Sequence, residues 1–91
     1  QAVMAVIKSK VIKTGYDKRK GNYIILKSNL MTFKYYHLYT VIVKKNQIVE
    51  PGEIIGITGS TGYSTGEHLH FEILIDGENV NPINVLIELN K

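Results

Sequence analysis

The sequence predicts an all-β domain, a small antiparallel sandwich or open barrel-like domain with a short C-terminal helical turn. Short β-branched or alternating segments cover most of the chain, and turn signals separate them. A single segment suits a helix. It runs from Ile83 to Leu89 and follows Pro82, a residue favoured at the first position of a helix.

The expected strands follow one another closely. An apolar run at residues 2–7 continues into an alternating segment at 8–13, and a polar loop between two glycines is expected at 14–21. The later strands are expected at 22–27, 33–38, 41–43, 53–58 and 68–75, with a hairpin-type turn at 76–77.

The period of two in a strand divides the segment 33–38 between two faces. It places Phe33, Tyr35 and His37 on one face. The other face is expected to carry Lys34, Tyr36 and Leu38.

Length and composition limit the possible classes of protein. A chain of 91 residues with 44% hydrophobic residues forms one small domain with a thin core. The absence of cysteine excludes disulfides, thiolate zinc clusters, iron–sulfur sites and cysteine nucleophiles. A transition-metal site would therefore need histidine or carboxylate ligands.

The net charge of +3 is divided unevenly along the chain. The first 47 residues hold ten lysines or arginines and one acid, whereas the last 44 hold seven acids and one lysine. A basic half can bind nucleic acid or an anionic surface, but isolated lysines among apolar residues are typical of the solvated face of strands. Because no nucleic-acid motif occurs, we expect no nucleic-acid partner.

The sequence contains no apolar run near the ~20 residues of a membrane span. Its first residues lack the pattern of a signal peptide. The chain begins with glutamine instead of methionine, so we expect it to be a piece of something longer.

Two histidines stand out because they share a strand face. His68 and His70 are two residues apart, about 6.5–7 Å at the Cα atoms, with Leu69 and Phe71 on the opposite, core-facing side. Such a pair indicates either a metal or catalytic site or two solvent-facing histidines. Its position directly after the glycine- and hydroxyl-rich segment 59–66 favours a site.

The other polar residues are less informative by themselves. His37 by itself is more typical of a packed or surface histidine. Glu72 shares the face of His68 and His70, but it is more typical of an exposed acid on a strand. Asp17 indicates a turn. The segment 59–66 has the spacing of a nucleophile elbow but precedes a strand instead of a helix, and it lacks the lysine of a phosphate-binding loop.

Four segments together resemble a known family. The run GSTGYSTGEHLHFEI at 59–73, followed by Asn81-Pro82, is similar to the signature of the lysostaphin-like or LytM-like zinc metallopeptidases. The upstream matches are YYHL at 35–38, IVEPGEIIG at 48–56 and GNYII at 21–25. The resemblance extends from about residue 2 to residue 82.

The resemblance implies a LytM-like peptidase domain over residues 1–91, of the duplicated hybrid motif type, with zinc on the floor of a narrow groove. It implies that His70 is a zinc ligand and that His37 and His68 are catalytic residues that orient water and stabilise the oxyanion. The residues expected to line the substrate groove are Tyr35, Gly59, Thr61 and Ser64. The implied substrate is a peptide bond of bacterial peptidoglycan, and the implied location is extracellular or in the cell envelope.

One part of the family pattern is missing. The other two zinc ligands of the family come from an H-x-x-x-D segment upstream of the strand that begins here at Ala2, so the domain is expected to be N-terminally incomplete. One ligand cannot hold catalytic zinc, because three protein ligands are the norm. Zinc is therefore expected for the complete domain and need not be bound by these 91 residues, which alone are expected to be inactive.

Three explanations of this departure remain. The ligand segment can belong to the rest of an active enzyme, or the chain can be an inactive module that binds peptide or an envelope protein partner. The third explanation is a metal held by His37, His68 and His70 together. We favour the active enzyme, because all three histidines of the family pattern are kept downstream.

Overall fold

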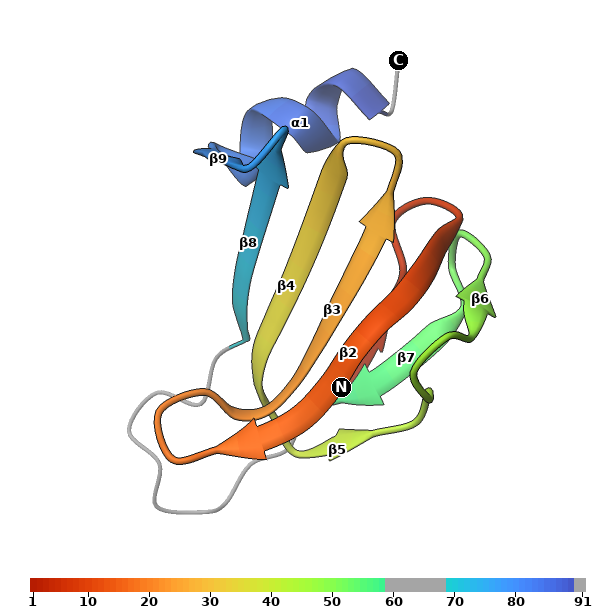
Figure 1. Ribbon diagram of the computed structural model, residues 1–91, viewed down its shortest axis with the longest axis vertical. Coiled ribbons are helices and arrows are strands. Elements are labelled where there is room, and N and C mark those ends of the chain that lie inside the picture. The colour runs from red at the N-terminus through yellow and green to blue at the C-terminus, as the bar shows by residue number, and fades with distance from the viewer. Residues whose placement is uncertain (59–68, 90–91) are drawn as a thin grey trace.

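The computed structural model describes residues 1–58 and 69–89, which form two antiparallel sheets and a helix (Figure 1). The larger sheet has the strand order β6-β2-β3-β4-β8-β9, and the smaller sheet has the order β1-β7-β5. The strands of the larger sheet are β2 (Ser9–Asp17), β3 (Gly21–Ser28), β4 (Met31–Leu38), β6 (Ile48–Val49), β8 (His70–Ile75) and β9 (Glu78–Val80). Those of the smaller sheet are β1 (Ala2–Met4), β5 (Thr40–Val41) and β7 (Ile54–Ile57).

The hydrophobic core lies on one face of the larger sheet. Side chains alternate along the central strands, so that this face buries Val11, Ile24, Leu26, Phe33, Tyr35 and Ile73. The smaller sheet contributes Val3 and Ile55 to the same core. We call the opposite face the outer face. Its residues alternate with buried residues along their own strand or pair with residues that do. They are Lys10, Lys13, Lys27, Lys34, Tyr36, His70 and Glu72.

The connection between β2 and β3 is shorter than the loop expected at 14–21. Strand β2 continues to Asp17, and β3 starts at Gly21. Gly15 lies inside β2, opposite its register partner Tyr23. The Tyr23 ring covers this position, and a Cβ atom at Gly15 would lie 2.8 Å from the Tyr23 hydroxyl, so a larger residue fits there only if the ring shifts. The glycine therefore indicates a close approach within the sheet, and not the start of a loop.

The C-terminal elements have local sequence causes. Asp76 and Gly77, at φ of 51° and 81°, form the two-residue turn between β8 and β9. The helix α1 (Pro82–Leu89) begins directly after Asn81, whose Oδ1 accepts a hydrogen bond of 2.9 Å from the backbone N–H of Ile83. An asparagine cap followed by proline is a favourable helix start.

The predicted fold class is confirmed: the described residues form antiparallel sheets with one short C-terminal helix. Within the described ranges, no helix has the length and apolar character needed to cross a membrane.

Gly56 provides a test of the packing between the sheets. It is buried in β7, and a Cβ atom there would lie 2.9 Å from the backbone oxygen of Thr40 and 3.3 Å from a methyl carbon of Leu38. We expect Gly56→Ala to lower the free energy of unfolding by about 1–3 kcal/mol, because the backbone of β5 must move. Ile54→Val, at an exposed position of the same strand, should change it by less than about 0.5 kcal/mol. Urea denaturation of both variants tests this, and equal midpoints would contradict it.

Candidate active site

The end of β4 turns a histidine onto the outer face. His37 has a left-handed backbone, with φ of 64°, and its N–H donates a hydrogen bond of 2.7 Å to the carbonyl oxygen of Lys20. As a result the alternation of β4 shifts: Leu38 is buried, whereas His37 is exposed. The expected division of residues 33–38 is therefore wrong at its last two positions. The register of β3 with β4 is irregular at the same level, between Asn22 and Ile24.

His70 lies next to His37 on the outer face. It is the register partner of Tyr36, and the two rings stack with centroids 5.3 Å apart and 10° between their planes. The His37 and His70 rings are 6.1 Å apart and nearly perpendicular. On the opposite side of β8, Phe71 packs on Tyr35 at 5.0 Å, so the expected orientation of this strand is confirmed for its described residues.

Glu72 contacts His70 directly. Its Oε2 lies 2.7 Å from Nε2 of His70, and both side chains are partly exposed. A carboxylate can only accept here, so Nε2 of His70 carries the proton. In the neutral ring this leaves Nδ1 with a free lone pair, the arrangement that orients histidines at many metal sites.

Tyr36 connects the histidines to a basic turn. Its ring contacts Tyr23 edge to face, with centroids 6.3 Å apart, and Nζ of Lys20 lies over both rings, 5.4 Å from Tyr23 and 5.5 Å from Tyr36. Burial raises the pKa of the Tyr36 phenol, and the negative charge of Glu72 raises it further. The Tyr36 hydroxyl therefore remains protonated and can donate a hydrogen bond at neutral pH.

A carboxylate holds the turn that binds His37. Asp17 Oδ1 accepts hydrogen bonds from the backbone N–H groups of Arg19 and Lys20, at 2.9 and 2.7 Å. These bonds, chiefly the one from Lys20, hold the pKa of Asp17 below its usual value. The interpretation of Asp17 as a turn residue agrees with this geometry. The same turn presents the carbonyl oxygen of Lys20 to His37.

The structure brings together two of the predicted site residues, His37 and His70. Tyr35, expected in the groove, instead lies in the core with 2% of its surface exposed, so this expectation is corrected. Its hydroxyl is buried and has no hydrogen-bond partner among residues 1–58 and 69–89, and burial raises its pKa. The other predicted site residues lie outside the described residues; they are His68, Gly59, Thr61 and Ser64.

The described side chains do not complete a zinc site. His70 and Glu72 offer an imidazole and a carboxylate, which are donor types that zinc takes in proteins. In residues 1–58 and 69–89, however, no three histidine or acidic side chains gather closely enough to hold a metal ion. His70 and Glu72 by themselves fall short of the three protein ligands that are the norm for catalytic zinc.

Sequence reasoning missed two residues of this site. The sequence pattern predicts the correct face for Glu72 but favours a solvated acid there, and it indicates no role for Tyr36. The signal for Glu72 is the strand period, because Glu72 is two residues after His70. Tyr36 directly precedes His37 in the YYHL motif, and the period of two assigns these neighbours to opposite faces, so it gives no signal for Tyr36.

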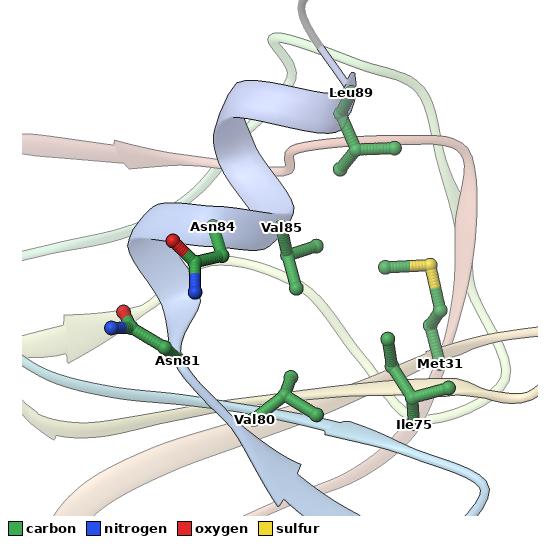
Figure 2. A pocket seen from close by; sticks show the side chains of 7 residues that line it. All are labelled: Met31, Ile75, Val80, Asn81, Asn84, Val85 and Leu89. Atoms are coloured by element: carbon green, nitrogen blue, oxygen red, sulfur yellow. The ribbon is translucent and has the colours of Figure 1, made fainter.

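An apolar pocket lies at the other end of β8, between α1 and the sheet (Figure 2). Its volume is about 360 Å³, and it is lined by Met31, Ile75, Val80, Val85, Leu89 and the amides Asn81 and Asn84. Ile75 is five positions after His70 along β8, about 17 Å of extended chain. The pocket is therefore not part of the histidine site.

The fold is that of a class of peptidases known from solved structures. The catalytic domain of lysostaphin from Staphylococcus simulans superposes with a TM-score of 0.83 and 34% identity, over 96% of this chain and 71% of that one. A zinc-containing peptidase from Vibrio cholerae gives a TM-score of 0.76 and 34% identity, over 87% of this chain and 25% of that one. The sequence model of peptidase family M23 matches residues 1–82. The chain belongs to this family, which confirms the resemblance seen in its motifs.

A curated relative supports the same assignment. The peptidoglycan DD-endopeptidase ShyC of Vibrio cholerae serotype O1 is 42% identical over 76 residues, which are 82% of this chain and 18% of that protein. The chain spans about a fifth of the length of the curated relatives it matches.

The backbone at His37 leads to an unusual stability prediction. A left-handed conformation costs a non-glycine residue about 1–2 kcal/mol, and glycine avoids this cost but loses about 0.5–1 kcal/mol in chain entropy. We therefore expect His37→Gly to raise the free energy of unfolding by about 0.5–1 kcal/mol. His37→Val should lower it, since β-branched residues tolerate positive φ least. Chemical denaturation measures both, and a fall for the glycine variant would show that contacts of the imidazole outweigh the backbone strain.

The carboxylate of Asp17 should make stability depend on acidity. Its pKa is lower in the folded chain than in the unfolded one, so its stabilising effect is complete above the ordinary value of 3.8 and is lost as the pH falls through the folded value. Asp17→Ala should therefore be less stable than the unmodified chain at neutral pH, with a difference that shrinks on acidification below pH 3.8. Thermal unfolding at a series of pH values tests this. If the stability difference between Asp17→Ala and the unmodified chain does not change with pH, the charge of Asp17 does not contribute, and the loss comes from the changed turn conformation alone.

Proposed function

We propose that the chain is the histidine-bearing part of a zinc-dependent metalloendopeptidase that cleaves peptide bonds of bacterial peptidoglycan. The observation that carries the proposal is the pairing of His37 and His70 on the outer face, with Glu72 bound to His70. Two imidazoles and a carboxylate on one accessible surface provide the groups that metal-assisted hydrolysis uses.

The comparisons support the substrate class. Relatives named peptidoglycan DD-endopeptidases share 36–42% of their residues with this chain over the matched part. Because the chain spans only about a fifth of these relatives, the activity of the complete protein is inferred from a shared domain. The proposed action on peptidoglycan implies a location outside the cell or in the cell envelope.

The residues have different roles in this proposal. His70 would hold zinc through Nδ1, because Nε2 is engaged by Glu72. Bound zinc supplies a Lewis acid and an activated water. His37, exposed beside His70, would exchange protons with the reacting groups or stabilise developing negative charge together with His68. Tyr36 orients the His70 ring by stacking on it.

The remaining ligands are proposed to come from an H-x-x-x-D segment that precedes Gln1 in the complete gene product. Determining the codons upstream of Gln1 tests this directly. If the segment is present, the donors reach the number of three that catalytic zinc requires. If the complete product lacks it, the zinc peptidase proposal fails.

A second candidate is an inactive module that binds peptide or an envelope protein on the same surface. It is favoured by the finding that the described residues do not gather three metal-binding side chains. The two candidates differ in metal content and hydrolysis, so one experiment on the complete gene product separates them.

We expect the complete gene product to release soluble peptides from purified peptidoglycan, and His70→Ala to reduce this release to background, because a ligand is lost. Glu72→Gln should weaken zinc binding by about 10–100-fold, as is typical for residues that orient a ligand. Tyr16→Phe, an exposed position of β2, is the control and should leave both measurements unchanged. Retained zinc and full hydrolysis in His70→Ala would contradict the proposed ligand. Peptide binding without hydrolysis by the unmodified protein would favour the inactive module.

A further inference from the structure

The outer face carries a group of lysines that the histidine site does not use. Lys10 and Lys27 are register partners across β2 and β3, and Lys13 and Lys34 flank Ile25 in the next cross-strand row. Val11, Leu26, Phe33 and Tyr35 are buried, and they neighbour Lys10, Lys27 and Lys34 along their strands, so these three lysines lie on the outer face. Lys13 joins them as the register partner of Ile25, which lies between the buried residues Ile24 and Leu26. We call these four residues the lysine face.

The fold does not neutralise this charge. In the part of the chain that the structure describes, no carboxylate lies within ion-pair distance of these four lysines. Glu72 is the register partner of Lys34, but its carboxylate is bound to His70. Like charges directly opposite each other, as in Lys10 and Lys27, destabilise a sheet. The lysine face is thus a positively charged surface without a carboxylate partner among the described residues.

The lysine face borders the histidine site. Lys34 precedes Tyr36 by two residues on β4, which places its row about 7 Å from the row of Tyr36 and His70. Lys13 is tied to the same region, because its Nζ lies 5.8 Å from the centroid of Tyr23. An extended peptide advances about 3.3 Å per residue, so a peptide cut beside His70 would present a side chain two residues away to this row.

We infer that Lys13 and Lys34 form a subsite for a side-chain carboxylate of an acidic peptide substrate. The inference rests on the proposed function and adds a specificity to it. The ligand is a carboxylate of the bound peptide, because Lys13 and Lys34 lie in the cross-strand row next to that of His70, and an extended substrate spans the distance between the two rows. Lys10 and Lys27 extend the positive potential beyond the subsite and attract the acidic substrate during encounter.

The test compares two forms of one peptidoglycan stem peptide, with its side-chain carboxylates free or amidated. Binding of each form to the full chain is measured by isothermal titration calorimetry. We expect the free acid to bind about tenfold more tightly than the amide, and this preference to weaken at high salt. Lys13→Gln combined with Lys34→Gln should abolish the preference.

A matched control removes the same charge elsewhere. Lys44→Gln combined with Lys45→Gln alters two exposed residues of the turn before β6 and should keep most of the preference. Unchanged unfolding midpoints of both double variants would show that the fold is intact. If the control pair abolishes the preference equally, net charge explains the effect and the subsite is refuted.

Two further outcomes would overturn the inference. Equal binding of the acid and the amide refutes the subsite while leaving the proposed peptidase function intact, because that function is tested by hydrolysis. Binding of a polyglycerol phosphate polymer that depends on Lys13 and Lys34, without binding of the acidic peptide, would assign the lysine face to an anionic polymer instead. Conversely, a carboxylate preference remains measurable even if the complete protein shows no hydrolysis.

Discussion

The hydrogen bond from the His37 N–H to the Lys20 carbonyl oxygen is the constraint on which the site depends. It holds His37 in a left-handed backbone, and that conformation moves one residue of β4 from the core face to the outer face. Leu38 then fills the core position that simple alternation would give to histidine. Without this shift, His37 would point into the apolar core, and only one of the two described histidines would reach the surface.

Several weak interactions support that one bond. The Asp17 carboxylate fixes the turn before Gly21, and Gly21 leaves room for the backbone of His37, whose Cα would lie 3.4 Å from an added Cβ. The Lys20 ammonium rests over Tyr36, which in turn stacks on His70. The turn between β2 and β3 therefore positions both histidines, one through its backbone and the other through an aromatic ring.

Sequence reasoning predicted the strands and the His70 face because both follow from local periodicity and turn residues. It could not predict the reversal at His37, because that depends on a carbonyl group 17 positions earlier in the chain. The assignment of Tyr35 to the groove rests on the family motif alone, whereas the structure buries it on the face of Phe33, against Phe71 of the neighbouring strand. The contact between the Glu72 carboxylate and the His70 ring depends on the rotamers of both side chains, which the strand period does not specify.

The left-handed backbone at His37 also restricts how this position can evolve. A relative that no longer needed the imidazole would still have to fit the same turn, and only a few residue types adopt positive φ at low cost. Asparagine, aspartate and glycine meet that requirement, whereas valine and isoleucine do not. Loss of function at this position should therefore follow a narrow mutational path, and the backbone would preserve a record of the lost histidine in the residues that replace it.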